Sequence, residues 1–304
     1  ILTCSLEPDN SLNRTSVNLS IRPRSNVQML TSTELHSVAQ QMKSAQDEAR
    51  QIQPFSSQTE GFDLPSAYAV ADLIHHARIR QGAVPVGRKI GFTNPDMWAQ
   101  YGVGEPIWAH IYDTTVVQSH CETKPCSISR FTEPKIEPKI IFHFRTAPPI
   151  GGDLKSILQC IDWVAHGFEI VQSHFPGWKF QAADTVADWA LHGTLLVGEP
   201  QPVDRLGPNL AAALERFSLT LLCDGVIREV GVGKNVLGSP LLAIAHLISV
   251  LSKHPKFPPL QANELVTTGT ITTAHPIEAG QVWRTEIQDI ALPGMAVEFE
   301  GINR

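Results

Sequence analysis

Apolar residues recur every three to four positions in three stretches of the chain, which predicts helices over residues 33–45, 65–80 and 239–254. Ser32 or Thr33 can cap the first of these helices. Pro65 and Pro240 each stand in a first helical turn, where proline's missing N–H breaks no helical hydrogen bond, and Ser239 can cap the last helix. Two of these helices therefore come early in the chain, and the third comes late.

Short apolar runs bounded by Gly, Pro and Asp predict strands in most of the remaining chain: 84–92, 108–117, 194–198, 217–225, 226–233, 265–271, 281–290 and 295–302. Residues 153–173 change from helical to strand-like spacing, and 182–193 has the pattern of a short helix that Gly193 ends. Helices thus come first, strands follow, and one long helix comes late. This order, with no repeated βαβ rhythm, predicts an α+β fold with a mixed, curled sheet.

The stretch RFTEPKIEPKIIFHF, residues 130–144, places a row of charges directly before an apolar run. Glu133, Lys135, Glu137 and Lys139 have the same parity, so in a strand they would project from one face. By itself this pattern fits either a solvated edge strand or a functional site.

Composition narrows the alternatives. The 304 residues are 42% hydrophobic and 18% charged, which is sufficient for a sizeable core, and the formal charge of −6 with no basic block argues against nucleic-acid binding. No apolar run approaches the ~18 residues of a membrane span, so we expect no membrane association. The five cysteines are few and odd in number, which argues against a disulfide framework, so we expect the protein in the cytoplasm. The stretch SHCETKPC fits a polar hairpin better than a zinc site, because no fourth ligand has motif spacing.

Several segments, in the same order, resemble 2-keto-4-pentenoate hydratases and the related 4-oxalocrotonate decarboxylases of the fumarylacetoacetate hydrolase superfamily. The segments are GRKIGFTNPDMWAQYGVGEPIWAHIYD, KIEPKIIFHF, GFEIVQSHFPGW, DTVADWALHG, NVLGSPLLAIAHL and LVTTGTITTAHPIEAGQVW. The resemblance implies a mixed β-roll or barrel with flanking helices, preceded by an N-terminal helical segment. We expect residues 31–304 to form a single catalytic domain and residues 1–30, in which Met29 is a plausible start, to be an irregular, disordered arm.

The resemblance gives the charged row a meaning. In the family, two glutamates two residues apart and a third on a later strand hold a divalent ion, and oxygen-only ligands suit Mg²⁺ or Mn²⁺. Matching IIF places Glu137 at the first position and Glu169 at the third, but Lys139 stands at the second. A protonated Lys139 would repel a cation and could pair with both glutamates instead, so the sequence leaves metal retention open. Glu133 is about 13 Å away along a strand and is no obvious substitute.

The same resemblance assigns four further site residues. Lys89 matches an active-site lysine near the substrate carboxylate, where it can anchor an anion or transfer a proton. Asp113 matches an acidic residue that lines the pocket and helps move protons. Thr270 matches a threonine that binds the substrate carboxylate, and Asp188 is a further, weaker candidate for substrate binding. His192 and its neighbour Leu191 stand where the family usually has small polar residues, a change that alters pocket polarity.

The function implied is that of a hydro-lyase acting on a small 2-hydroxy-2,4-dienoate or 2-oxo-enoate, with hydration of the 2-keto-4-pentenoate type, in the catabolism of aromatic compounds. We expect the protein to be a homo-oligomer. Two alternatives remain: a decarboxylase of 2-oxo-3-enedioates, and a non-catalytic scaffold that binds an oxo acid, since Lys139 replaces a ligand. No His–Glu arrangement in the sequence identifies a water-activating base of the kind that carbon–carbon bond hydrolysis requires.

Overall fold

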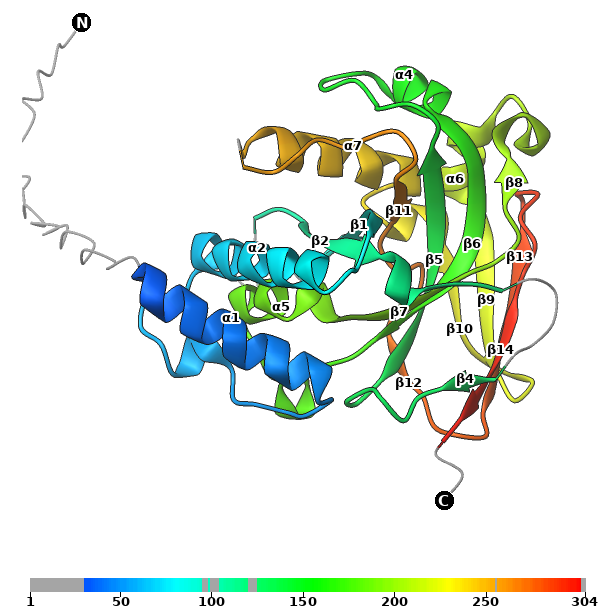
Figure 1. Ribbon diagram of the computed structural model, residues 1–304. Helices are drawn as coiled ribbons and strands as arrows, with labels where there is room; N and C mark the ends of the chain where they lie inside the picture. Colours follow the sequence, from blue (N-terminus) through cyan, green and yellow to red (C-terminus); the bar gives the residue numbers. More distant parts are fainter. Residues whose placement is uncertain (1–29, 95–97, 99–103, 120–124, 255, 302–304) are drawn as a thin grey trace, which may run out of the picture.

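The computed structural model describes residues 30–94, 98, 104–119, 125–254 and 256–301, and the arm expected at 1–30 lies outside it except for Leu30. Two curled sheets enclose the main apolar core, and three helices pack together at one side of the larger sheet (Figure 1). The helices are α1 (Ser32–Asp47), α2 (Leu64–Arg80), α4 (Leu154–Gln159), α5 (Ala182–Ala187), α6 (Leu210–Arg216) and α7 (Pro240–Ser252). This architecture confirms the predicted α+β class with a mixed, curled sheet.

The larger sheet has the order β2-β1-β11-β5-β6-β7-β3, with β12 paired to β5 and β8 paired to β6. Its strands are β1 (Pro85–Gly91), β2 (Ile107–Tyr112), β3 (Val116–Gln118), β5 (Lys135–Phe144), β6 (Ile161–Val171), β7 (His192–Val197), β8 (Gln201–Pro202), β11 (Leu265–Thr267) and β12 (His275–Pro276). The smaller sheet, in the order β10-β9-β13-β14-β4, contains β4 (Cys126–Ser127), β9 (Ser218–Cys223), β10 (Val226–Val232), β13 (Val282–Gln288) and β14 (Ala296–Glu300). Parallel and antiparallel pairs mix in both sheets, and strands far apart in sequence become neighbours.

The helix boundaries differ from the sequence prediction at two points. Thr31, not Ser32 or Thr33, caps α1: its hydroxyl accepts from the Glu34 N–H, and the Glu34 carboxylate accepts from the Thr31 N–H. Of the predicted helix 182–193, α5 covers Ala182–Ala187 with Asp188 as its C-cap, and Gly193 lies inside β7 instead of capping a helix. The reason is a left-handed turn at residues 189–191, which redirects the chain into the sheet.

Helix α7 is largely buried in the main apolar core. Ser239 caps it and Pro240 opens it, as predicted. Eight of its side chains are buried, and α4 and α6 contact it. Contrary to the sequence analysis, the segment Gly233–Ser252 is long and apolar enough to cross a membrane by length and composition, a property that a buried core helix shares.

A buried ion pair links β1 to the residue directly before β11. The Arg88 side chain is 2% exposed, and its Nη1 donates to Glu264 Oε1 over 2.6 Å. We expect Glu264→Gln to lower the free energy of unfolding by about 3 kcal/mol, because it leaves the buried guanidinium without a countercharge. Glu286→Gln is the matched control, since Arg284 and Glu286 pair at the surface, where the loss should stay below about 1 kcal/mol. Equal effects of the two changes in chemical denaturation would contradict a structural role for the Arg88 pair.

Candidate active site

The two glutamates expected to act together lie directly opposite each other. β5 and β6 are antiparallel, with Glu137 opposite Glu169 and Lys139 opposite Gly167. Cross-strand partners share a face, and residues two apart on one strand share it as well. The pleat therefore brings Glu137, Lys139 and Glu169 to one face of the larger sheet, in the relation that the sequence predicted.

Lys139 occupies the space between the two carboxylates. Its Nζ lies 2.6 Å from Glu137 Oε2 and 3.1 Å from Glu169 Oε2. The other oxygen of Glu169 receives Lys89, whose Nζ lies 2.7 Å from Oε1 and 2.7 Å from the carbonyl oxygen of Ala190. An ammonium has three donors, so each lysine keeps one N–H with no acceptor among the described residues.

The four charges are almost completely removed from water. The side chains of Lys89 and Lys139 are 3% exposed and that of Glu169 is 0% exposed, whereas Glu137 keeps 16%. Burial raises the pKa of Glu169, but the two ammonium groups outweigh burial and hold that pKa well below its usual value. Burial lowers the pKa of Lys89. For Lys139, Glu137 and Glu169 outweigh burial and raise the pKa, so its ammonium persists at neutral pH.

Sequence analysis missed a histidine in this cluster. The Nδ1 of His192 lies 2.8 Å from Glu169 Oε1, and its Nε2 lies 3.0 Å from the hydroxyl of Thr115. Burial lowers the pKa of His192, which keeps the imidazole neutral at physiological pH. The His–Glu pair is therefore present, although its members are separated by 23 positions in sequence and form no motif that would have identified them.

Two buried hydroxyls lie beside the lysines without a hydrogen-bond partner in the described chain. Thr267 is opposite Lys89 in the parallel β1–β11 ladder, so both side chains share a face. Thr270, a predicted substrate-binding residue, follows in the turn that runs along β5, where the Ile271 N–H donates to the Pro138 carbonyl. Unpaired buried hydroxyls are costly unless a ligand uses them, so both are candidates for contacting an oxo acid.

The turn after β11 is closely packed at Gly269. A Cβ at this position would lie 1.6 Å from the Thr93 hydroxyl oxygen, so no other residue fits without rearrangement. The glycine thereby keeps the Thr270 segment against Thr93.

The structure does not bring the remaining predicted residues into the cluster. Asp113 is exposed in the turn after β2, where its Oδ1 accepts from the N–H groups of Val84 and Thr114, so the expected proton-transfer role has no support from its position. Asp188 is buried, and its carboxylate accepts from the backbone and ring of His174. Glu133 is bound to Gly177 N–H, away from the other two glutamates.

Proteins with assigned activities are similar in sequence to most of this chain. The chain is 30% identical over 278 residues to 2-keto-4-pentenoate hydratase of Paraburkholderia xenovorans (strain LB400), covering 89% of this chain and 97% of the relative. This chain belongs to the 2-keto-4-pentenoate hydratase family. It is also 27% identical over 250 residues to a 4-oxalocrotonate decarboxylase of a Pseudomonas species, covering 80% and 92% of the two chains. A scan against protein-family models finds no match.

Solved structures confirm the fold expected for this hydratase family. A 4-oxalocrotonate decarboxylase from Pseudomonas putida G7, complexed with magnesium and adipate, superposes with a TM-score of 0.80 at 24% identity, covering 90% of this chain and 99% of that one. A fumarylpyruvate hydrolase from Pseudomonas aeruginosa, in complex with Mn²⁺ and pyruvate, gives a TM-score of 0.55 at 16% identity over 70% and 88%. The fold is therefore that of the fumarylacetoacetate hydrolase superfamily, some of whose members bind a divalent ion.

The cluster of this hydratase-family chain does not fit a divalent ion as it stands. Lys139 Nζ lies where an ion shared by Glu137 and Glu169 would lie, within 3.1 Å of both carboxylates. At about 4 Å and an effective dielectric constant near 20, repulsion between an ammonium and a doubly charged ion is about 8 kcal/mol. Within the described residues, no group of three or more His, Cys, Asp or Glu side chains is placed to hold a metal.

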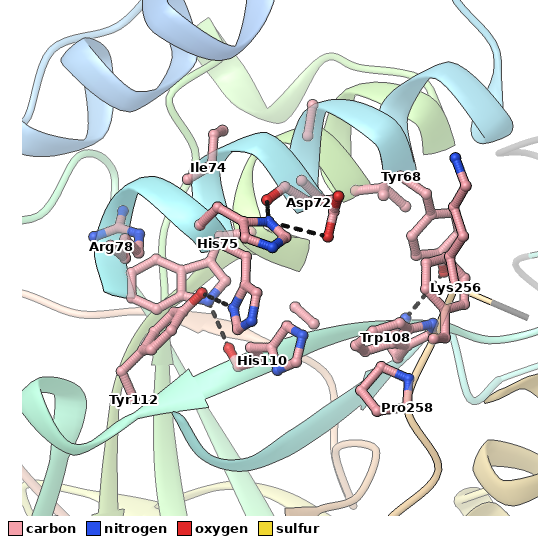
Figure 2. A pocket seen from close by; sticks show the side chains of 17 residues that line it. Tyr68, Asp72, Ile74, His75, Arg78, Trp108, His110, Tyr112, Lys256 and Pro258 are labelled. Carbon is pink, nitrogen blue, oxygen red and sulfur yellow. Dashed lines mark hydrogen bonds and ion pairs between the residues drawn. The ribbon is translucent and has the colours of Figure 1, made fainter. Parts of the chain in front are cut away.

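A cavity of about 230 Å³ lies apart from the charged cluster, between α2 and β2. None of the predicted site residues lines it. Trp108, Ala109, His110 and Tyr112 line it from β2, which is the edge strand of the larger sheet. Figure 2 shows His75 of α2 next to Tyr112 and His110, with its Nδ1 in a hydrogen bond with the Tyr112 hydroxyl.

The walls of the cavity are largely aromatic, and two of its histidines, His75 and His110, are uncharged. The rings of His75 and His110 stack with centroids 3.7 Å apart. Burial lowers the pKa of His75 to about 4 and that of His110 to about 2, so neither ring is protonated at neutral pH. The left-handed turn connects the cavity with the cluster: Trp189 lines the cavity and donates to the His110 carbonyl, and the next residue, Ala190, accepts from Lys89.

That turn stores backbone strain next to the site. Trp189, Ala190 and Leu191 have φ values of 54°, 47° and 64°, in a region that non-glycine residues rarely adopt. Such strain persists only where surrounding contacts enforce it, and it is common at functional sites. Here it aims the Ala190 carbonyl at the buried Lys89 ammonium.

Proposed function

We propose that this protein is a hydro-lyase that adds water to a small 2-hydroxy-2,4-dienoate, as the name of its hydratase relative describes, in the catabolism of aromatic compounds. The observation that carries the proposal is the pair of buried ammonium groups, Lys89 and Lys139, which meet at Glu169 and each retain a donor that no described residue accepts. Family membership over nearly the whole chain supports the reaction class.

The reaction develops negative charge on the substrate, which the site must stabilise. In the dienol, the proton on the 2-hydroxyl leaves and a proton adds at the far end of the diene, which gives a 2-oxo-3-enoate. Water then adds across the remaining double bond, with hydroxyl on C4 and hydrogen on C3, and the 2-oxo oxygen carries negative charge in between. Donors fixed around that oxygen stabilise this charge without reorganising during the reaction.

The residues divide these tasks. Lys89 and Thr267 share a face and together offer an ammonium and a hydroxyl to the substrate carboxylate. Lys139, beside the Thr270 turn, offers its free N–H to the 2-oxo oxygen. Glu137 is the group of the cluster with the most exposure, so it is best placed to exchange protons with an incoming water.

A decarboxylase is the second candidate, because a decarboxylase is also among the relatives and uses the same stabilised enolate. The non-catalytic alternative rests on Lys139 alone, and the family membership gives it no added support.

A substrate panel tests the proposal. We expect the purified protein to consume 2-hydroxypenta-2,4-dienoate, with loss of the dienoate absorbance and formation of a 4-hydroxy-2-oxo acid detected by mass spectrometry. A 2-oxo-3-enedioate is the parallel substrate, and carbon dioxide release from it would identify the decarboxylase. If the folded protein turns over neither substrate but still binds 2-oxo acids in calorimetry, the proposal of an enzyme is overturned. The non-catalytic scaffold then remains.

A further inference from the structure

The position of Lys139 is that of a bridging cation. Its ammonium contacts Oε2 of Glu137 and Oε2 of Glu169, two carboxylates that the antiparallel ladder sets directly opposite each other. Like charges in this arrangement repel across a ladder unless a positive charge lies between them. The side chain is 3% exposed, so water does not perform this task.

The charges of the cluster already balance. Lys89 and Lys139 supply two positive charges, and Glu137 and Glu169 supply two negative ones. A divalent ion added to this set would leave an excess of two positive charges in a site shielded from water, which is unfavourable. Exchanging Lys139 for a glutamate would instead leave a deficit of two, which is the charge of one divalent ion.

We propose that the Lys139 ammonium is a built-in replacement for the divalent ion, so that this protein binds its oxo acid and turns it over without metal. The substrate part of this inference rests on the proposed function, whereas the metal part rests on the geometry alone. Lys139 then contacts the 2-oxo oxygen directly and is a catalytic residue.

The replacement changes how the acid is held. A metal ion can bind the carboxylate and the 2-oxo oxygen at once, but an ammonium with two of its donors already used has a single N–H to offer. The second positive group, Lys89, must therefore take the carboxylate, and its own free N–H allows this. The acid is held by two separate cations rather than chelated by one.

Titration with Mn²⁺, followed by the electron paramagnetic resonance signal of the free ion, tests the metal part. We expect Lys139→Glu to bind Mn²⁺ at least ~10-fold more tightly than the parent, because one positive charge leaves the site and one negative charge enters. Lys139→Met removes the ammonium without adding a ligand and should bind with intermediate affinity, which keeps the test decisive if the glutamate variant fails to fold. Lys155→Glu makes the same change at an exposed lysine of α4, and as the matched control it should bind as the parent does.

The outcomes separate the inference from the proposed function. Equal Mn²⁺ affinity in the parent and the Lys139 variants would overturn the replacement, whatever the substrate is. In the panel, equal turnover in chelator and in Mg²⁺ is expected, and loss of turnover in chelator that Mg²⁺ restores would also overturn it. Failure of every substrate in the panel would count against the proposed function and leave the Mn²⁺ result unaffected.

Discussion

Changing Glu169 to Gln is expected to reduce kcat/KM by at least ~1000-fold, equivalent to about 4 kcal/mol of transition-state stabilisation. Glu169 is the only residue that contacts both Lys89 and Lys139 among the described side chains, and it also binds His192. Gln keeps the shape but removes the charge, so both ammonium groups lose their shared partner and their positions. The same loss of countercharge should lower the free energy of unfolding by about 3 kcal/mol.

Steady-state kinetics and chemical denaturation of the same preparations measure both effects. Asp162→Asn is the matched control, because Asp162 is also on β6 and also pairs with a histidine, His143, but lies near the surface. The control should retain activity and stability close to those of the parent. A folded Glu169→Gln protein with kcat/KM within about threefold of the parent would remove Glu169 from the mechanism.

Changing Lys89 to Met is expected to lower kcat/KM by at least ~100-fold, or about 2.7 kcal/mol. Met keeps most of the aliphatic stem and removes the charge that we assign to the substrate carboxylate. Because Lys89 also neutralises Glu169, a raised KM distinguishes anchoring of the substrate from a general disturbance of the cluster. Arg at this position should recover part of the binding, since it restores the charge but not the fit.

Lys135→Met is the control for this prediction. Lys135 is the first residue of β5 and lies over the Trp178 ring 3.8 Å away, so its loss removes a lysine from the same sheet but not from the site. A change of less than about threefold in Lys89→Met would show that the buried ammonium only balances charge within the fold.

The local sequence pattern was sufficient to predict much of the fold. Helical spacing and capping signals predicted α1, α2 and α7 within two residues at their N-terminal ends, because apolar periodicity and cap chemistry depend on neighbours in sequence. The boundary at Gly193 was wrong because Trp189, Ala190 and Leu191 adopt left-handed conformations that tertiary contacts impose. A glycine is the residue expected at such a turn, and none of the three is one.

The candidate site, too, was predicted in part from the sequence and decided in part by tertiary contacts. The parity of Glu137 and Lys139 fixed their common face from sequence alone, since the side-chain period of a strand is two. Resemblance to the hydratases supplied Glu169 and Lys89 but also placed Asp113 in the site, and the structure puts Asp113 in an exposed turn. Resemblance carries over residue types at matching positions and says nothing of where a turn directs them.

By itself, then, the sequence determined the element types, the common face of Glu137 and Lys139, and the family. Only the tertiary structure decided that Lys139 lies between two carboxylates, that His192 pairs with Glu169, and that Thr267 stands beside Lys89. These contacts join strands that are distant along the chain, and their register is set by packing of the whole sheet. The local sequence pattern determines the face of the strand on which a side chain lies. The residue opposite it on the next strand depends on the register, which the burial of all the strands together sets.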